Sequence, residues 1–448
     1  MSQRNIRNLI CDAVAEILED GAYSGAVLSG AFNKYDTMSR SERAFFTKVT
    51  IGTVEMALYL DALIDLVSQT KVRKMKPQVR TILRMSVYQM LYLDRTPDPA
   101  VCNEAVKIAK KRGLFGLSGF VNGVLRTISR DKEKLVEQLA VSAPPNVPVS
   151  MPEPVFHLFE QQYGRDRART ICTSFLSDSP VYLRTETSRV GKSHLKKMLA
   201  AEHIDVSEIG EHLPKESGIF SHPAMFDYAL CAKGALPLSS LATFEGGLFY
   251  VQDLSSMAAC EAAIDGLAKD APLSVIDVCA SPGGKSLLIA DRLPKAEVFA
   301  CDISKEKLSR IKENIRRLKA ERVSVRLRDA SKPDPSEAGR YGLVICDLPC
   351  SGLGVLRRRP EIKYRITERQ IAELAALQEK ILDASAPLVC PGGRLSYSTC
   401  TISRRENEEQ ADAFLTRHPQ FERIFQRQLL PDADGCDGFF NAVFVRRG

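Results

Sequence analysis

Hydrophobic residues in the first 140 positions recur at the spacing of a helix. The first such stretch has one apolar face, made by Ile6, Leu9, Ile10, Ala13, Ile17 and Leu18. Apolar positions three and four residues apart lie on one side of a helix and are typical of amphipathic helices. Two longer stretches of this kind follow at residues 44–67 and 79–93. No convincing alternating strand pattern occurs among them, so the pattern predicts an all-helical domain over residues 1–140.

The pattern becomes mixed after a short segment that is rich in proline. Residues 141–148 contain three prolines, and this composition is typical of a linker. Beyond it, residues 156–163 and 192–201 have helical spacing, and residues 181–184 predict a strand. We therefore expect a small α+β module over residues 150–245.

From residue 246 to residue 448 the chain alternates between apolar strands and amphipathic helices. The expected strands are 273–279, 297–302, 323–327, 342–347 and 394–398. The expected helices are 285–292, 305–319, 367–386 and 404–417. Such alternation predicts an α/β domain with a doubly wound, Rossmann-like parallel sheet.

Composition narrows the class of protein. Hydrophobic residues make up 44% and charged residues 26% of 448 residues, which excludes a disordered or fibrous chain. No apolar run reaches the roughly 18 residues that a membrane span needs, and the first residues lack the apolar core of a signal peptide. We therefore expect a cytoplasmic chain with no membrane partner, whose 12 cysteines are reduced thiols. No Cys-x-x-Cys pair occurs, so we expect no metal site.

Positive charge is concentrated in one part of the helical domain. Residues 71–134 contain 15 Lys and Arg against 5 Asp and Glu, a local net charge of +10 in a chain of net charge +7. Such a concentration has two interpretations, a solvated helical surface or a site for a polyanion such as RNA.

The turn after the first expected strand of the α/β domain is rich in small residues. Gly283 and Gly284 allow the backbone to approach a ligand closely. A phosphate-binding P-loop is excluded because its first glycine would fall at Cys279, and the dinucleotide motif G-x-G-x-x-G is absent. The turn is therefore either a nucleotide-type binding loop or a site of tight packing.

Two acidic residues follow the next two strands. Asp302 ends the second expected strand, about 20 residues past the turn, where an acid can bind ribose hydroxyls. It is equally well placed to cap the helix that begins after Ser304. Asp329 follows the third strand and is placed near an adenine.

Two cysteines follow the fourth and fifth expected strands. Cys350 comes three residues after Asp347, and Cys400 follows a Ser-Thr pair. Neighbouring parallel strands end at one edge of a sheet, so both thiols could face one pocket. Because no His lies between residues 223 and 417, catalysis with a histidine base has no candidate here. A thiol and an acid suit methylation at C5 of a pyrimidine, in which a thiolate adds to C6 and makes C5 nucleophilic.

These motifs resemble the RNA 5-methylcytosine methyltransferases that use S-adenosylmethionine. The resemblance implies a donor-binding loop made of Cys279, Ala280, Ser281, Pro282, Gly283, Gly284 and Lys285. It also implies that Asp302, Asp329 and Asp347 belong to the donor site. By the same resemblance Cys400 is the nucleophile, Cys350 assists product release, and Asp347 stabilises the target ring.

The resemblance covers the whole chain. Residues 51–53, 82–84, 103–106 and 120–125 resemble the RNA-binding domain of antitermination factor B. This domain, placed before an RNA-binding α+β module and the catalytic domain, is similar to the Sun/Fmu type of the family. It implies a specific cytosine of 16S ribosomal RNA as the target, no DNA partner and a monomer. The chain departs from the family at Glu186, where Asn is usual, and at Tyr364, which stands at the place of a Trp.

Two other functions are compatible with the motifs. One is a non-catalytic RNA-binding or ribosome-assembly factor that retains the site, and the other is a methyltransferase for protein or DNA on the same fold. We also expect residues 357–359, with Lys363 and Tyr364, to contact RNA phosphate near the target, the other interpretation being a solvated loop.

Overall fold

The computed structural model describes residues 5–94, 96–178, 180–211, 226–232 and 238–448. It divides into two compact units. The helical unit comprises Met1–Ser177 and Leu356–Arg365, and the sheet unit comprises Asp178–Val355 and Ile366–Gly448. The α+β segment after residue 178 therefore lies in the same unit as the large sheet. No helix in the described part of the chain is long and apolar enough to cross a membrane.

The helical unit is built from amphipathic helices, as the sequence pattern predicts. They are α1 (Ile6–Leu18), α2 (Ser24–Lys34), α3 (Arg40–Glu55), α4 (Ala57–Val67), α5 (Pro77–Tyr92), α6 (Asp98–Lys111), α7 (Ser118–Ser142), α8 (Glu153–Tyr163) and α9 (Arg165–Ser174). The stretch 44–67 is two helices, because the backbone leaves helical geometry at Met56. Helix α3 begins at a capping box in which Ser39 and Glu42 bond each other's backbone N–H groups. The apolar faces meet in one core.

The proline-rich segment lies inside the helical unit rather than between the two units. Within this segment, Asn146 Nδ2 donates a hydrogen bond to the backbone oxygen of Met151 at 2.8 Å. Val149 and Met151 are buried. The prolines therefore shape a packed turn in this unit, and the chain leaves the unit only after Ser177.

A second, distant segment of the sequence completes the helical unit. The short 3-10 helix η8 (Pro360–Tyr364) lies in it. Glu361 accepts a hydrogen bond from the backbone N–H of Ser24 at 3.1 Å, and Lys363 Nζ donates to the backbone oxygen of Glu55 at 2.7 Å. Lys363 is only 3% exposed, and Tyr364 Oη also bonds Glu55. Packing withdraws Lys363 from the surface, so the prediction that Lys363 contacts RNA phosphate is wrong. Tyr364 is half-buried, and its contact with RNA stays a prediction.

The sheet unit contains a small antiparallel sheet and a large mixed sheet. The described strands of the small sheet are β1 (Val181–Thr185), β2 (Val206–Glu208), β3 (Ala229–Ala232) and β4 (Phe249–Val251), in the order β2-β3-β1-β4. Helices α10 (Lys192–Ala201) and α11 (Ala242–Glu245) accompany them. The apolar side chains of this sheet and of α10 form a core of their own.

The large sheet has seven strands. They are β5 (Leu273–Asp277), β6 (Ala296–Asp302), β7 (Val323–Leu327), β8 (Tyr341–Asp347), β9 (Val389–Thr399), β10 (Phe421–Leu429) and β11 (Phe439–Arg446), in the order β10-β11-β9-β8-β5-β6-β7. The five predicted strands are parallel, and β8 pairs with β9 as expected. The last two strands are antiparallel, so the sheet is mixed.

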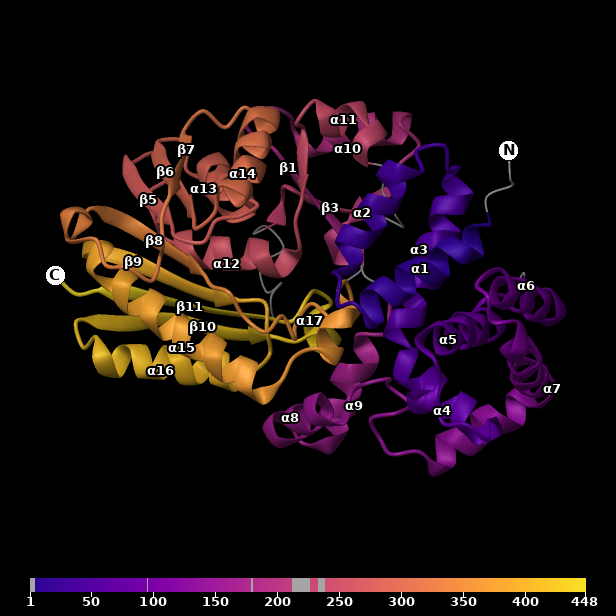
Figure 1. The fold of residues 1–448 in the computed structure, drawn as a ribbon. Coiled ribbons are helices and arrows are strands. Elements are labelled where there is room, and N and C mark those ends of the chain that lie inside the picture. The colour runs from indigo at the N-terminus through magenta and orange to yellow at the C-terminus, as the bar shows by residue number, and fades with distance from the viewer. Residues whose placement is uncertain (1–4, 95, 179, 212–225, 233–237) are drawn as a thin grey trace. The chain divides into compact units, whose positions relative to one another are not determined.

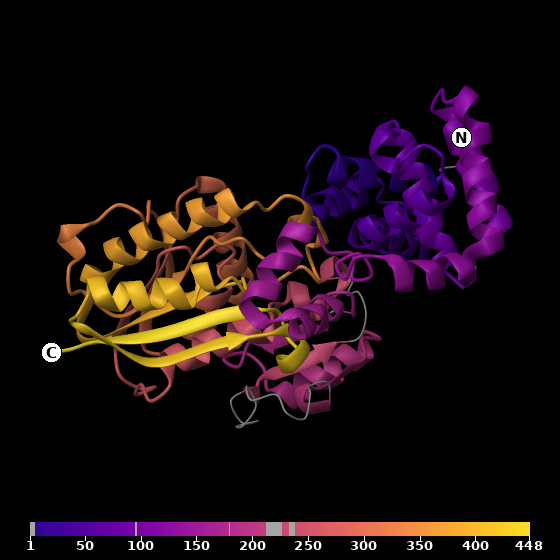
Figure 2. The same ribbon diagram turned by 90° about the horizontal axis from the view of Figure 1, so that it is seen from below.

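Helices cover both faces of the large sheet, which confirms a doubly wound α/β fold (Figures 1 and 2). Helices α12 (Leu254–Ile264), α13 (Gly284–Arg292) and α14 (Lys305–Leu318) pack on one face, and α15 (Glu368–Ser385) and α16 (Glu408–Arg417) on the other. Successive strand residues point to opposite faces, so Val275 joins the first core and Ile276 the second. A short helix, α17 (Pro431–Asp434), precedes β11.

Candidate active site

The parallel strands bring the predicted motifs to one edge of the large sheet. Asp277 ends β5, Asp302 ends β6, and Asp347 ends β8. Cys400 follows the last residue of β9 directly. The carboxyl ends of parallel strands share an edge, where open α/β sheets bind their ligands. The four motifs that the sequence analysis selected therefore meet in space.

The loop between β5 and α13 is shaped by its two glycines. Gly283 has φ +104°, a conformation that side chains rarely adopt. At Gly284 an added Cβ would lie 3.3 Å from Cε1 of Tyr250 and 3.5 Å from the side chain of Gln252. The backbone is held by a hydrogen bond from the N–H of Ala280 to the oxygen of Cys301 at 2.8 Å. Glycine at 284 thus leaves space between the loop and the side chains of Tyr250 and Gln252, which a Cβ would partly fill.

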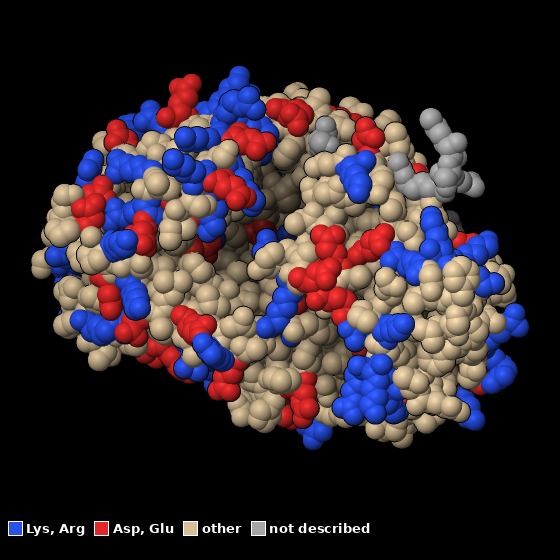
Figure 3. Space-filling model, in the orientation of Figure 1, with Lys and Arg blue, Asp and Glu red and all other residues tan. Residues whose placement is uncertain are grey.

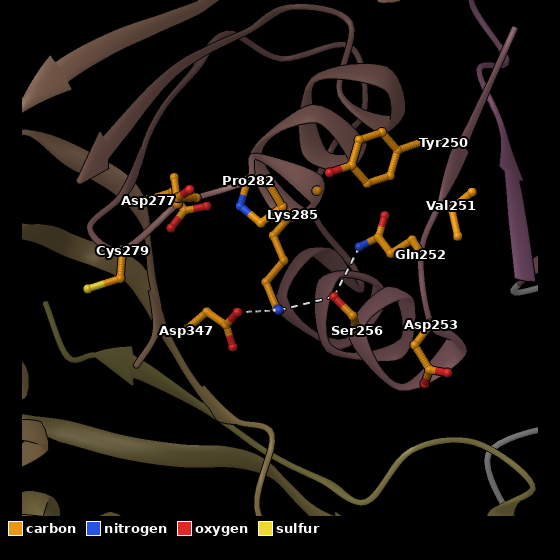
Figure 4. Close-up of a pocket in the computed structure, with 13 residues that line it drawn as sticks. Tyr250, Val251, Gln252, Asp253, Ser256, Asp277, Cys279, Pro282, Lys285 and Asp347 are labelled. Carbon is orange, nitrogen blue, oxygen red and sulfur yellow. Dashed lines mark hydrogen bonds and ion pairs between the residues drawn. The ribbon is translucent and has the colours of Figure 1, made fainter. Parts of the chain in front are cut away.

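A pocket lies against this loop (Figure 4). It is lined by Tyr250, Val251, Gln252, Asp253, Ser256, Asp277, Cys279, Ala280, Ser281, Pro282, Gly284, Lys285 and Asp347. Six of these residues, Cys279 to Pro282 with Gly284 and Lys285, belong to the loop that the sequence analysis selected. Gly283 shapes the loop without lining the pocket, and neither Asp302 nor Asp329 is among the lining residues.

Sequence reasoning missed the opposite wall of the pocket. Tyr250, Gln252 and Ser256 come from β4 and the start of α12, where no motif marks them. The fully buried Arg184 of β1 links this wall to the loop, since its Nη1 donates to Gln252 Oε1 and to the oxygen of Gly284, both at 2.8 Å. Its guanidinium lies 5.1 Å from the ring centre of Tyr250. The available signal was an arginine within an otherwise largely apolar strand.

Asp302 holds the binding loop rather than capping the next helix. The buried Asp302 accepts a hydrogen bond from the N–H of Ser281 at 3.2 Å and pairs with Lys307 Nζ at 3.2 Å. The cap of α14 is Ser304, whose hydroxyl accepts from the N–H of Lys307. The helix-cap interpretation of Asp302 is therefore wrong.

Asp329 lies after β7 on a partly exposed turn. It accepts hydrogen bonds from the N–H and the hydroxyl of Ser331, at 3.1 and 2.6 Å. The hydrogen bond from the Ser331 side chain lowers the pKa of Asp329 below its usual value. Its carboxylate is therefore held in an ionised form at the edge of the sheet.

Lys285 crosses the pocket from α13 and binds Asp347 and Ser256 (Figure 4). Its Nζ lies 2.6 Å from Asp347 Oδ2 and 3.0 Å from Ser256 Oγ. The second oxygen of Asp347 accepts a hydrogen bond from Ser398 Oγ at 2.8 Å. Burial lowers the pKa of Lys285, but the surrounding negative groups, with Asp347 foremost, together outweigh burial and the pKa is raised. Asp347 is thus an oriented carboxylate between the pocket and the end of β9.

Asp277 is a second carboxyl group of the pocket and is almost completely buried. Ser286 Oγ donates to its Oδ2 at 2.7 Å. Its Oδ1 has no hydrogen-bond partner among the described residues. Burial raises the pKa of Asp277 to about 7. The site therefore holds two carboxyl groups of different character, one paired with Lys285 and one desolvated.

The two predicted cysteines face each other. Cys350 Sγ and Cys400 Sγ are 3.2 Å apart, as a hydrogen-bonded pair. The pairing of β8 with β9 places Asp347 opposite Ser398, so the residues that follow both strands start side by side. The hydrogen bond with Cys400 and burial raise the pKa of Cys350 well above its usual value. Cys350 is therefore a neutral thiol near neutral pH.

Close backbone contacts hold the two cysteine loops together. The N–H of Gly354 donates to the oxygen of Cys400 at 3.0 Å, and the N–H of Gly438 donates to the oxygen of Gly354 at 2.9 Å. A Cβ on Gly354 would lie 1.8 Å from the oxygen of Gly438. Gly438, which directly precedes β11, therefore holds the loop that contains Cys350 in place.

Comparison with known proteins decides the family. The family described as 16S rRNA methyltransferase RsmB/F matches residues 267–445, and the NusB family matches residues 4–130. The "Probable ribosomal RNA small subunit methyltransferase B" of Bacillus subtilis (strain 168) is 34% identical over the whole of both chains. The chain belongs to the RsmB/F family of methyltransferases. The "Ribosomal RNA small subunit methyltransferase B" of Yersinia pestis bv. Antiqua (strain Angola) is 31% identical and 99% of each chain is covered.

Solved structures confirm the fold of this RsmB/F-family enzyme. The crystal structure of PH0851 has a TM-score of 0.77 at 21% identity and covers 99% of each chain. The structure of NSun6 from Pyrococcus horikoshii with SFG has a TM-score of 0.53 at 21% identity. It covers 66% of this chain and 98% of that chain. The helical domain followed by a methyltransferase sheet is thus a shared architecture.

The methyl donor of this methyltransferase is S-adenosylmethionine, and the pocket fits it. Gly284 permits close approach of the donor to the loop, and Tyr250 offers an aromatic surface on the opposite wall. Asp277 and Asp347 provide carboxyl groups for a ligand that is positively charged at its sulfonium. Bound in this pocket, the donor would supply an electrophilic methyl group.

Proposed function

We propose that this enzyme transfers the methyl group to C5 of a specific cytosine in 16S ribosomal RNA through a covalent bond between Cys400 and C6. The observation that carries the proposal is the pair of thiols 3.2 Å apart at the ends of β8 and β9. Asp347, three residues before Cys350, belongs to the donor pocket and also bonds Ser398 next to β9's end. The nucleophile and the donor site are thus joined by one carboxylate.

The proposed chemistry follows from the weak reactivity of the pyrimidine ring. The Cys400 thiolate adds to C6, and Asp347, a carboxylate paired with Lys285, stabilises the ring by accepting a hydrogen bond from the 4-amino group beside N3. The electron pair displaced from the C5–C6 double bond makes C5 nucleophilic, and C5 takes the methyl group from the sulfonium, which is left as a neutral thioether. A base then takes the C5 proton, the C–H electron pair re-forms the C5–C6 double bond, and the bond from C6 to Cys400 breaks with its electron pair on sulfur. Cys350, in contact with Cys400, assists this release.

The partner we propose is RNA. A cytosine in folded RNA must be unstacked before Cys400 can reach C6. The helical unit contains the basic stretch 71–134, and Lys and Arg side chains form patches over part of its surface (Figure 3). We propose 16S ribosomal RNA as the substrate, with no DNA, a monomeric enzyme and a cytoplasmic location, where bacterial ribosomes are made.

The test is transfer of a labelled methyl group to 16S ribosomal RNA, followed by bisulfite mapping of the product. Wild type should mark one cytosine, and Cys400→Ser should transfer none. Cys350→Ala should accumulate a covalent protein–RNA adduct, because release is impaired. Transfer by Cys400→Ser, or a product other than 5-methylcytosine, would contradict the proposal. RNA binding without any transfer by wild type would instead favour an assembly factor.

A further inference from the structure

A buried carboxylate lies beneath the loop that contains Cys350. Glu406, at the end of the 3-10 helix η10 (Arg404–Glu406), is 0% exposed. Its Oε1 accepts from the N–H of Ser351 at 2.8 Å, and its Oε2 accepts from the Ser351 hydroxyl at 2.6 Å. Gln378 Nε2 donates to Glu406 Oε1 at 3.3 Å and to the oxygen of Pro349 at 2.9 Å. The residues on both sides of Cys350 are therefore held through one carboxylate.

The neighbouring residue does the same for Cys400. Asn407 Oδ1 accepts from the Thr399 hydroxyl at 2.5 Å, and its Nδ2 donates to the oxygen of Thr401 at 3.0 Å. The two halves of this arrangement meet, since the hydroxyls of Ser351 and Thr401 are 2.7 Å apart. Both cysteine loops are therefore held by hydrogen bonds to two consecutive residues, Glu406 and Asn407.

We propose that Glu406 is a positioning residue that holds the Cys350 thiol against Cys400 for the release step, with Asn407 holding the Cys400 loop. The inference rests on the proposed function, because it assigns a consequence to the thiol pair. The hydrogen bonds of the Glu406 carboxylate go to Ser351, Gln378 and Thr401 rather than to either sulfur, so it positions the thiols through these neighbours.

The chemistry of the group explains why a carboxylate stands there. A carboxylate only accepts hydrogen bonds, and both oxygens of Glu406 face donors. A glutamine side chain has nearly the same shape but replaces one carboxylate oxygen with an NH2 group, so the Ser351 hydroxyl that now donates to Glu406 would have to turn and accept instead. The hydrogen bonds to a charged carboxylate are also about twice as strong as those to a neutral amide, so the loop should be held less firmly and shift. Displacement of the Ser351 backbone moves the adjacent Cys350 directly.

The test compares Glu406→Gln with Glu409→Gln in the full-length enzyme, using 16S ribosomal RNA and S-adenosylmethionine. Glu409, three residues after Glu406, is the second residue of α16 and is exposed, so it controls for the loss of one negative charge. We expect Glu406→Gln to lower kcat at least tenfold, to leave KM for both substrates within twofold, and to accumulate the covalent adduct as Cys350→Ala does. Glu409→Gln should match wild type in all three.

A second variant covers the case in which Glu406→Gln fails to fold. Ser351→Ala keeps the N–H bond to Glu406 and removes only the hydroxyl, so we expect a kcat loss of several-fold and a smaller amount of adduct. Wild-type kcat and no adduct in both variants would overturn the inference. A reduced kcat without adduct would also overturn it. So would a rise in KM as large as the fall in kcat, because general loosening of the site predicts both of these results. If Cys350→Ala itself forms no adduct, the proposed function fails instead.

Discussion

At the scale of single residues, the site depends on how charge is paired at the edge of the sheet. Lys285 is buried and its ammonium group is neutralised by Asp347, which is itself half-buried. Asp347 also bonds Ser398, so one side chain connects the donor pocket to the strand that precedes Cys400. Removal of either partner leaves the other with no compensating charge.

Asp347→Asn should therefore impair both stability and transfer. The ammonium of Lys285 loses its partner, and we expect a loss of about 1–3 kcal/mol, less than for a fully buried pair because Asp347 is partly solvated. Chemical denaturation measures this loss. The double variant Lys285→Met/Asp347→Asn should recover part of it, because no charge is then stranded. A double variant no more stable than Asp347→Asn alone would contradict this account.

Asp277 predicts a pH dependence. Its pKa is raised to about 7 by burial, from a usual value of 3.8. Between these values the folded protein binds more protons than the unfolded chain, so this group makes the free energy of unfolding fall as pH rises from about 4 to about 7. Asp277→Asn should remove that contribution. The measurement is the urea midpoint at pH 5 and pH 8 in both proteins, and an equal pH dependence in both would refute the assignment.

At the scale of elements, strand order and close loop contacts build the site. The parallel pairing of β8 with β9 aligns the starts of the two cysteine loops, and Gly354 and Gly438 let these loops touch. The alternating pattern of the sequence predicts strands β5 to β9 and their helices, because the apolar residues of each element repeat with the period of a strand or of a helix. It could not show where β9 begins, since exposed residues 391–392 interrupt its apolar run.

Gly354→Ala should separate the two loops. The added methyl group would lie 1.8 Å from a backbone oxygen and 2.9 Å from another, neither of which can move alone. We expect a cost of about 1–3 kcal/mol from overpacking and a loss of most methyl transfer. Thermal unfolding and the transfer assay measure these effects. Gly191→Ala is the matched control, because a Cβ there meets nothing within 4 Å, and equal effects of the two substitutions would contradict the prediction.

At the scale of the whole molecule, the units do not follow the order of the sequence. Residues 356–365 lie between two elements of the large sheet in sequence but belong to the helical unit. Arg365 Nη2 donates to the backbone oxygens of Ile17 and Ala22, the first at 2.9 Å. A contact of this kind ties the end of α1 to a segment more than 340 residues away.

Arg365→Ala should loosen the end of α1 and leave the nearby strand β8 unchanged. Hydrogen bonds from a charged donor contribute about 1–2 kcal/mol each, so amides of residues 17–23 should exchange faster with deuterium. Residues 341–347, closer in sequence, should exchange as in wild type. Arg369→Ala is the control, since Arg369 is exposed and pairs with Glu373 of its own helix. Faster exchange in β8 rather than at residues 17–23 would show that the segment belongs with the sheet.

The sequence by itself determined the elements and the set of reactive groups. Local periodicity encodes helices and strands, and the motifs that follow Asp277, Asp347 and Thr399 supply the candidate reactive groups whatever the strand order is. Only the tertiary structure decided which groups meet. The distance between the thiols of Cys350 and Cys400, the wall of the pocket that includes Tyr250, the buried Glu406 and the place of residues 356–365 all depend on contacts between distant parts of the chain. Such contacts arise from packing and strand pairing, which leave no periodic trace in the sequence.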